Sequence, residues 1–348
     1  MSTATAVRIG IVGAGANTRS RHIPNLKAQA GTEIVSVCNR SRESAEKVAS
    51  EFGIPRICQH WKELVESADI DAVVIGTWPY LHCPVTLAAL AAGKHVLTEA
   101  RMAMNSAEAR LMLEASRRNP HLVAQVVPSP YTLKIDRTVQ KLLAEGFVGE
   151  LQALEVRANA PGFLDHTSPL HWRHNRDLSG FNILGMGIWY EAVMRWVGEA
   201  KTVSAMTRVS VKQRRDSSGV INTISVPDHA DILAEMVCGA QGRFQFSAVT
   251  GLAPGPEVWL FGSEGTLRYD ASSEQLSGAR RGETAFHEIA IPTELSIGWR
   301  VEEEFINAIR GVEMVKFTTF EDGLKYMQFT EAVSRSAASG ASVDVQQV

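Results

Sequence analysis

The first part of the chain alternates between short apolar runs and amphipathic stretches. The apolar runs predict buried strands at residues 7–12, 33–38, 71–76, 95–98 and 122–127. Apolar residues at helical spacing predict helices from the turn after the first strand to about residue 29, and at residues 42–52, 61–67, 84–92 and 107–118. Strands and helices that alternate in this way form a parallel sheet covered on both faces. We therefore predict a doubly wound α/β domain over residues 1–128.

The pattern changes after about residue 130, where longer alternating runs predict a mostly antiparallel sheet. Its strands are expected at residues 151–158, 202–211, 229–238, 243–250 and 258–261, with a tight turn at residues 262–267. Helices are expected near residues 133–145, 183–197, 299–309 and 320–338. We interpret the charged cluster Lys212, Arg214, Arg215 and Asp216 as a solvated loop. Residues 129–348 are thus predicted to form an α+β domain, whose last helix is a candidate to pack back on the first domain.

Composition and charge then exclude several classes of protein. A length of 348 residues suggests two domains, since a domain has about 150 residues. The 35 Lys and Arg and 38 Asp and Glu give a net charge of −3, so nothing favours nucleic acid or an anionic membrane as partner. The four cysteines form no Cys-x-x-Cys pair, which is typical of reduced thiols in the cytoplasm. Residues 1–6 are too short and polar for a signal sequence, and no apolar run approaches the ~18 residues of a membrane span.

A glycine-rich turn carries the first candidate chemistry. Gly13-Ala14-Gly15-Ala16-Asn17-Thr18 comes directly after the first strand and opens a helix. Gly13 allows the tight turn, and Gly15 lets the backbone approach a pyrophosphate at the helix N-terminus. Thr18 occupies the third position of the motif, so we expect the helix to pack slightly farther from the sheet. A plain structural turn is the alternative, but the flanking strand and helix favour a dinucleotide bound by Gly13, Gly15, Ala16 and Asn17.

The end of the second strand discriminates between the two nicotinamide dinucleotides. An acidic residue about 20 residues after the glycines would bind the ribose hydroxyls of NAD. The chain instead has Asn39-Arg40-Ser41. No carboxylate repels a 2′-phosphate there, and Arg40 with Ser41 can bind one. We therefore favour NADP(H), with NAD(H) still possible and with a merely solvated Arg40 as the simpler interpretation.

Several motifs resemble the family of glucose–fructose oxidoreductase, inositol dehydrogenase and MocA. They are residues 13–26 with His22-Ile23-Pro24, the Thr77-Trp78-Pro79-Tyr80-Leu81-His82 loop, residues 92–99, residues 304–311 and residues 320–324. The loop is similar to the family's Thr-Pro-Asn-x-x-His, with an extra bulky residue and Tyr80 for asparagine. The resemblance implies a Rossmann domain, a C-terminal domain with an open sheet, and a nicotinamide cofactor that faces a polyol or sugar pocket. The cofactor contacts implied are Thr77, Trp78, Tyr80, His82, Glu99, Ala100 and Gln125, and Trp172 and Arg173 from the second domain.

The chain departs from this family at its catalytic positions. Glu99-Ala100-Arg101 replaces Glu-Lys-Pro, whose lysine hydrogen-bonds the reacting hydroxyl in the family. Gly185 and Trp189 stand where the family places an aspartate and a histidine. General acid or base help is worth ~10²–10⁴ in rate. An active enzyme of this sequence therefore needs replacement groups.

Two segments of the second half offer replacements. His166 and His171 are the first candidates, because histidine titrates near neutrality. Their loop ends in Trp172-Arg173, which resembles a family Trp-Arg pair and would lie at the mouth of the pocket. Tyr190 and Glu191 follow Trp189 directly, and a phenol or desolvated carboxylate can transfer protons. A half-buried tyrosine and a surface glutamate are the simpler interpretations.

Further candidates are weaker. Arg101 could polarise a carbonyl or hold an anion, although a pair with Glu99 or a cofactor phosphate is the leading alternative. Lys134 could supply a surrogate amine, but an exposed helix residue is the better interpretation. Asp165 and the loop histidines have ligand types that suit a metal, but their spacing matches no ordered motif, so no metal is expected.

Three functions fit these residues. The favoured one is an NADP(H)-dependent oxidoreductase that acts on a sugar, cyclitol or related hydroxy or keto compound. The second is a tightly bound nicotinamide used transiently for glycoside cleavage or elimination, and the third is a non-catalytic dinucleotide-binding sensor or scaffold. Apolar residues of the open sheet (Phe244, Phe246 and Val249) suggest a homodimer or homotetramer.

Overall fold

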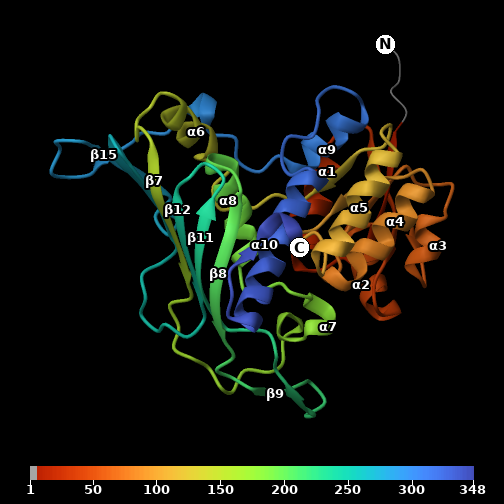
Figure 1. The fold of residues 1–348 in the computed structure, drawn as a ribbon. Coiled ribbons are helices and arrows are strands. Elements are labelled where there is room, and N and C mark those ends of the chain that lie inside the picture. Colours follow the sequence, from red (N-terminus) through yellow and green to blue (C-terminus); the bar gives the residue numbers. More distant parts are fainter. Residues whose placement is uncertain (1–5) are drawn as a thin grey trace. The chain divides into compact units, whose positions relative to one another are not determined.

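The computed structural model describes residues 6–348, and the chain divides into two compact units (Figure 1). The first unit contains Met1–Pro128 and Arg300–Leu324, and the second contains Ser129–Trp299 and Lys325–Val348. The segment Arg300–Leu324, which we expected in the second domain, therefore belongs to the first unit. Within residues 6–348, no helix is long and apolar enough to cross a membrane. The prediction that residues 1–6 are no signal sequence concerns a segment of which residues 1–5 lie outside the described residues.

The first unit is built on a six-stranded sheet in the order β3-β2-β1-β4-β5-β6. Every pair in this sheet is parallel, and the strand order reverses between β1 and β4. The strands are β1 (Val7–Val12), β2 (Thr32–Cys38), β3 (Arg56–Ile57), β4 (Ala72–Ile75), β5 (His95–Thr98) and β6 (Ala124–Val126). The helices are α1 (Ile23–Ala28), α2 (Arg42–Phe52), α3 (Trp61–Val65), α4 (His82–Ala91), α5 (Ser106–Arg118) and α9 (Val301–Ile309). The doubly wound fold that the sequence predicts is confirmed.

Local chemistry explains the ends of α2, which match the prediction. The Ser41 hydroxyl accepts the backbone N–H of Ser44 at 3.3 Å and caps the start of the helix. Gly53 ends the helix at φ +63°, a conformation that glycine adopts without strain. The residue after this cap leads to β3, a two-residue strand that the hydrophobic pattern did not predict.

The second unit contains a nine-stranded mixed sheet, in the order β16-β15-β14-β13-β7-β12-β11-β8-β17. Only β7 and β12 pair in parallel; the other neighbours are antiparallel, as predicted for most of this sheet. The strands are β7 (Leu151–Asn159), β8 (Ala200–Arg208), β11 (His229–Met236), β12 (Gln241–Ser247), β13 (Glu257–Gly262), β14 (Gly265–Asp270), β15 (Gln275–Arg280), β16 (His287–Glu288) and β17 (Val343–Asp344). The helices are α6 (Asp136–Ala144), α7 (Arg176–Ser179), α8 (Met186–Val197) and α10 (Phe320–Ser339), and α10 begins in the first unit.

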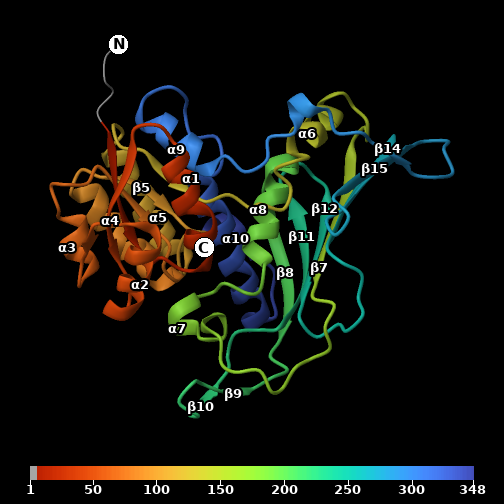
Figure 2. The same cartoon turned by 180° about the vertical axis from the view of Figure 1, so that it is seen from behind.

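Helices α8 and α10 lie on one face of this sheet, as Figures 1 and 2 show from opposite sides. An aromatic cluster holds them there. Tyr190 of α8 stacks on Phe329 of α10, with ring centroids 3.7 Å apart. The ring centroid of Phe244, on β12, lies 5.4 Å from that of Phe329. Phe244 and Phe246 are fully buried, so they do not form the open apolar face that we expected of them. Side chains at alternate positions, such as Arg243, point to the other face.

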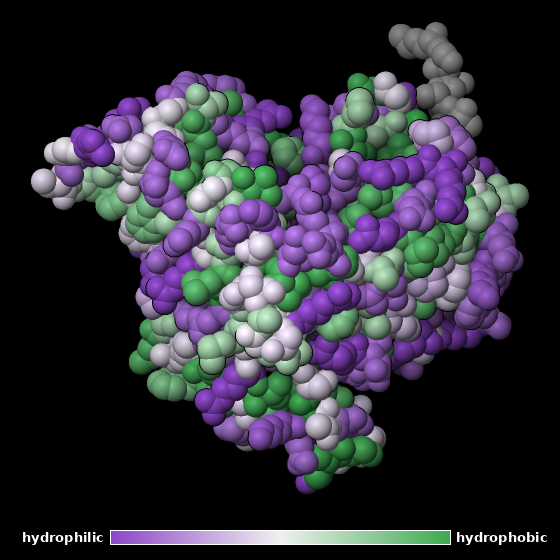
Figure 3. All heavy atoms as spheres, viewed as in Figure 1, coloured by the Kyte–Doolittle hydropathy of each residue, from purple (hydrophilic) through white to green (hydrophobic). Residues whose placement is uncertain are grey.

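The charged cluster around residue 212 also differs from the prediction. Gln213–Arg215 forms β9 and pairs with β10 (Ile221–Thr223) in a separate hairpin. The turn of this hairpin is held by Asp216, whose carboxylate accepts the backbone N–H of Ser218 at 2.9 Å. Figure 3 shows hydrophobic residues at this lower tip, where Val220 and Ile221 are exposed. A strand of polar residues gives no apolar alternation, so the sequence pattern missed it.

Candidate cofactor site and its surroundings

A cavity of about 500 Å³ lies in the first unit at the carboxyl ends of β1, β2 and β4. This is the point where the strand order reverses, which is where open α/β sheets bind ligands. The sequence-predicted residues that line the cavity are Gly13, Gly15, Asn39, Arg40, Ser41, Thr77, Trp78 and Tyr80. Its other lining residues are Val12, Ala14, Cys38, Ser44, Gln59, His60, Trp61, Gly76 and Leu81.

The two glycines of the turn serve different purposes. Gly13 has φ +87°, and a Cβ there would lie 2.6 Å from Cγ2 of Thr77 and 2.7 Å from its backbone nitrogen. Only glycine fits this position. A Cβ on Gly15 would meet nothing closer than the Gly76 carbonyl oxygen at 3.6 Å. Packing therefore does not require Gly15, and its missing side chain leaves backbone open toward the cavity.

The Thr18 side chain fits because the residue that follows β4, Gly76, has no side chain. The side chain of Thr18 is buried, and its hydroxyl donates to the Gly13 carbonyl at 3.2 Å. A Cβ on Gly76, just after β4, would lie 2.0 Å from that hydroxyl oxygen. Close packing at the third motif position thus depends on Gly76. Residues Thr18–His22 form a π-helix ahead of α1, where we expected a regular helix.

The end of β2 carries no acidic residue, and its side chains have defined roles. The Asn39 amide oxygen accepts the Ala14 N–H at 2.7 Å, and its nitrogen donates to the Ser44 hydroxyl at 2.9 Å. Asn39 therefore joins the glycine turn to α2. The Arg40 guanidinium lies 5.0 Å above the Trp78 ring and makes no salt bridge within residues 6–348. Among the described residues, the cavity lining holds no aspartate or glutamate.

Sequence reasoning missed three lining residues that follow β3, namely Gln59, His60 and Trp61. The two residues of β3 form no recognisable apolar run, so nothing in the hydrophobic pattern marked its end. The topology could have provided the signal, because a doubly wound half-sheet needs a strand between α2 and α3. The residues that follow such a strand reach the ligand edge of the sheet.

A buried charged cluster lies on the other side of the glycine turn. His22 is fully buried, with Nε2 2.9 Å from Glu99 Oε1 and Nδ1 2.5 Å from Glu302 Oε1. Burial alone would lower the pKa of His22, but the two carboxylates outweigh it and raise the pKa to about 9. Burial likewise opposes ionisation of Glu99 and Glu302, yet His22 holds both pKa values below the usual range.

This cluster accounts for two of the predicted cofactor residues. The Asn17 side-chain amide donates to Glu99, so both belong to the network that surrounds His22. The other carboxylate oxygen of Glu302 accepts from the Asn25 amide at 3.1 Å. Neither Asn17 nor Glu99 lines the cavity, and Ala16 beside them is exposed. A cofactor contact by these three residues stays a prediction.

His82 and Gln125 are buried and contact protein atoms. The ring nitrogens of His82 lie 2.9 Å from the Thr77 carbonyl oxygen and 2.9 Å from that of Arg101, so the ring joins two loops. Gln125 donates to Glu304 Oε2 at 2.8 Å and to the Phe317 carbonyl at 2.6 Å. Both residues position the segments around them and leave no exposed surface for a cofactor.

Ala100 follows Glu99 and is half-buried, with its backbone N–H 3.2 Å from the Glu99 carboxylate. The position of the family's lysine thus has no side chain that could exchange a proton. Arg101 is buried in the first unit, and its pairing with Glu99 or with a cofactor phosphate stays a prediction. A role in polarising a substrate carbonyl gains no support from this burial.

The histidines predicted for proton transfer lie in the second unit, on the loop before α7. His166 and His171 are both exposed. His171 Nδ1 accepts the Arg173 N–H at 3.3 Å, and desolvation with the nearby Arg173 charge lowers the pKa of His171. The Arg173 guanidinium lies 4.2 Å above the Trp172 ring. Residues 6–348 contain no group of three or more His, Cys, Asp or Glu side chains arranged to hold a metal.

Tyr190 and Glu191 are placed in the interior of the second unit. The Tyr190 hydroxyl accepts the Ala200 N–H at 2.7 Å, and burial raises its pKa. Glu191 accepts the Ser129 N–H at 2.7 Å and pairs with Arg195 at 2.5 Å. These contacts occupy both side chains, so the geometry argues against the proton-transfer roles that the sequence suggested for them.

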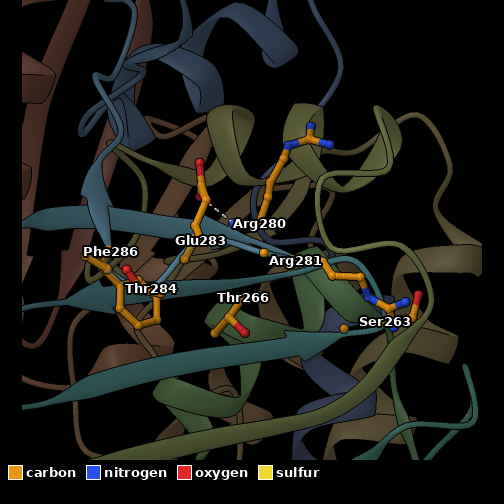
Figure 4. A pocket seen from close by; sticks show the side chains of 12 residues that line it. Ser263, Thr266, Arg280, Arg281, Glu283, Thr284 and Phe286 are labelled. Atoms are coloured by element: carbon orange, nitrogen blue, oxygen red, sulfur yellow. Dashed lines mark hydrogen bonds between the residues drawn. The ribbon is translucent and has the colours of Figure 1, made fainter.

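A second cavity, of about 380 Å³, lies in the second unit between β14, β15 and the loop that follows (Figure 4). Arg280 and Arg281 point in different directions there. Arg280 lies 4.7 Å above the Phe147 ring, and its backbone N–H donates to Glu283 at 2.7 Å. The polar groups of this cavity do not converge on a common point.

Comparisons with known proteins agree with this architecture. Residues 7–126 match the oxidoreductase family GFO_IDH_MocA, with its NAD-binding Rossmann fold, and residues 137–268 match the GFO/IDH/MocA C-terminal domain. The chain is 28% identical over 285 residues to a dTDP-3,4-didehydro-2,6-dideoxy-alpha-D-glucose 3-reductase from Streptomyces violaceoruber, with 80% of this chain and 77% of that protein covered. It is 25% identical over 353 residues to levoglucosan dehydrogenase from Pseudarthrobacter phenanthrenivorans, with 90% and 89% covered.

A solved structure of levoglucosan dehydrogenase, in complex with NADH and L-sorbose, shares the fold with a TM-score of 0.86 at 22% identity. It covers 97% of this chain and 98% of its own. This likeness concerns the fold, and the two matched domains confirm the family that the motifs indicated. The chain belongs to the Gfo/Idh/MocA family of NAD-binding oxidoreductases.

Proposed function

We propose that the protein is an NADP(H)-dependent dehydrogenase or reductase of a sugar, cyclitol or related hydroxy or keto compound. The observation that carries the choice of cofactor is the lining of the cavity. Arg40 and Ser41 line it, and none of the lining residues within 6–348 is a carboxylate. An adenosine 2′-phosphate would therefore meet a guanidinium and hydroxyls without repulsion, and charge-assisted hydrogen bonds of this kind are strong. NAD(H) would leave Arg40 without an anionic partner.

The names of the relatives support the substrate class. One is a reductase of a dTDP-linked keto sugar and another is a dehydrogenase of levoglucosan. Hydride transfer requires that a carbinol or carbonyl carbon be held against C4 of the nicotinamide. The cofactor supplies that chemistry, and the chain's own residues bind its adenosine end at Arg40 and Ser41 and admit its pyrophosphate over Gly15.

Proton transfer falls to the exposed histidines of the second unit in this proposal. Position 100 is an alanine where the family has a lysine. The side chains of Tyr190 and Glu191 accept hydrogen bonds inside the second unit. His171 is exposed, and its lowered pKa keeps the imidazole neutral at pH 7, which suits a base that accepts a proton from an alcohol. His166 on the same loop is the second candidate, and Trp172 with Arg173 would contact the cofactor or substrate.

Fluorescence titration with NADPH and NADH tests the cofactor. We expect tighter binding of NADPH, and Arg40→Ala should weaken it by about 10- to 100-fold because a charged hydrogen bond is lost. NADH affinity should not change. Arg42→Ala is the matched control, since Arg42 pairs with Glu46 on the exposed face of α2 and does not line the cavity. Tighter binding of NADH by the unaltered protein would contradict the proposal.

A panel of sugars and cyclitols tests the reaction. Net oxidation or reduction is expected, and His171→Asn should lower kcat by about 10²- to 10⁴-fold without loss of NADPH binding. If His166→Asn lowers kcat more than His171→Asn does, His166 is the residue that transfers the proton. Cofactor that survives dialysis and is not consumed would support transient oxidation instead. Binding without turnover of any compound would support a sensor.

A further inference from the structure

The connection between β3 and α3 brings a histidine to the adenosine side of the cavity. β3 pairs in parallel with β2, with Val37 opposite Ile57. The Cys58 N–H then donates to the Val37 carbonyl at 3.0 Å, so the two chains still run side by side where β2 ends. His60 follows two residues later and lines the same cavity as Arg40 and Ser41.

The hydrogen bond that His60 makes determines which of its nitrogens can donate. His60 caps the start of α3, where its Nδ1 accepts the Lys62 N–H at 3.2 Å. A ring nitrogen that accepts a hydrogen bond carries no proton, so the proton of the neutral imidazole must be on Nε2. Within residues 6–348, Nε2 of His60 has no hydrogen-bond partner. It is an unused donor at the edge of a ligand cavity.

The imidazole of His60 also lies beside the ring of the next residue, Trp61. Its ring lies 5.4 Å from the ring of Trp61, tilted by 32°, and Trp61 also lines the cavity. The His60 side chain is exposed, and the cap at Nδ1 and the contact with the Trp61 ring orient it. A donor that is held in advance loses little conformational freedom when a ligand binds.

Four polar groups of the lining suit the same chemical group, namely the guanidinium of Arg40, the hydroxyls of Ser41 and Ser44, and the imidazole of His60. The other polar side chains of the lining are neutral, and none of the described lining residues is a carboxylate. A phosphate monoester offers three acceptor oxygens and nearly two negative charges. A ribose hydroxyl offers one weak acceptor, so it would use fewer of these groups.

We propose that His60 donates through Nε2 to the adenosine 2′-phosphate and that it helps to set the preference for the phosphorylated dinucleotide. This inference rests on the proposed NADP(H) dependence. It assigns a third chain segment, the β3–α3 connection, to cofactor discrimination, beside the end of β2 and the start of α2.

Two small ligands isolate the contact. Adenosine 2′,5′-bisphosphate and adenosine 5′-monophosphate differ only in the 2′-phosphate, and calorimetry measures the affinity of each for the full chain. His60→Ser keeps a good N-cap residue for α3 and removes the imidazole. We expect about tenfold weaker binding of the bisphosphate and unchanged binding of the monophosphate. His60→Gln retains a side-chain donor and should recover part of the loss.

The matched control is His121→Ser, since His121 is an exposed histidine of the same unit outside the cavity. Suppose that the unaltered protein prefers the bisphosphate. If His60→Ser then shows the same preference, the role of His60 is overturned and the proposed cofactor is not. Equal losses for both ligands would likewise overturn the role of His60, because the contact would then be with the adenosine. No preference in the unaltered protein overturns the proposed cofactor and this inference together.

Discussion

The two halves of the parallel sheet differ in how their charged side chains are paired. On the side of β1, β2 and β3, the cavity lining has a guanidinium and an imidazole donor that lack anionic partners within residues 6–348. On the side of β5 and β6, buried carboxylates are matched by the protein itself, as His22 matches Glu99 and Glu302. The first arrangement leaves its donors available to a ligand. The second is complete, and it fixes the frame on which the first is built.

Removal of His22 should have the largest effect. His22→Ala leaves the Glu99 and Glu302 carboxylates buried without the cation between them. Breaking a buried ion pair in this way costs about 3–5 kcal/mol, so the free energy of unfolding in urea should fall by that amount. His287→Ala, at an exposed histidine of β16, provides the control. A loss below about 1 kcal/mol would show that the cluster does not hold the frame.

The same cluster predicts how stability varies with pH. The pKa of His22 is raised from 6.5 to about 9 in the folded chain. Its contribution is therefore fully present below pH 6.5 and is lost as the pH rises through about 9. Unfolding monitored between pH 6 and 10 should show stability that falls across this window. The slope should be reduced in His22→Ala, and an equal slope in both proteins would contradict the assignment.

A carboxylate introduced into the open side should change cofactor choice. Asn39→Asp keeps an acceptor for the Ala14 N–H but places a negative charge in the cavity. We expect about 10- to 100-fold weaker NADPH binding and equal or tighter NADH binding, as titrations would show. Asn119→Asp adds the same charge outside the cavity and should leave both affinities unchanged. A parallel loss for both cofactors would indicate damage to the glycine turn instead.

Substitution of Lys134 should have the smallest effect. Its ammonium pairs with Glu274 at 2.9 Å, and the two side chains are 51% and 60% exposed. Exposed pairs of this kind contribute ~0–1 kcal/mol, so Lys134→Met should leave thermal unfolding and turnover nearly unchanged. Loss of turnover by two orders of magnitude would instead identify Lys134 as the missing amine.

The sequence predicted those parts whose chemistry is local. The glycine turn and the bounds of α2 were found where expected, and in the structure the cap at Ser41 and the stop at Gly53 are formed by residues beside the helix. The short β3 was not predicted, because two residues carry no periodic signal. His60 was missed for the same reason.

Other features depend on contacts far apart in the sequence. The alternation on β12 shows that Phe244 and Arg243 face opposite sides of the sheet. It does not show which side is buried, because that depends on where α8 and α10 pack. The burial of Tyr190 follows from its stack on Phe329, which is more than a hundred residues later. The exposed charges around residue 212 formed a hairpin because Arg215 pairs with Ile221 across a polar turn.

The return of Arg300–Leu324 to the first unit has a consequence for synthesis. Glu302 and Glu304 reach partners that leave the ribosome some 180 to 280 positions earlier, as the bonds to Gln125 and His22 show. Translation must pass every strand of the second sheet except β17 before those buried partners meet. Nascent chains halted near residue 290 should therefore expose Gln125 and His22 to solvent, and the nucleotide-binding half should gain protease resistance only when elongation is almost finished.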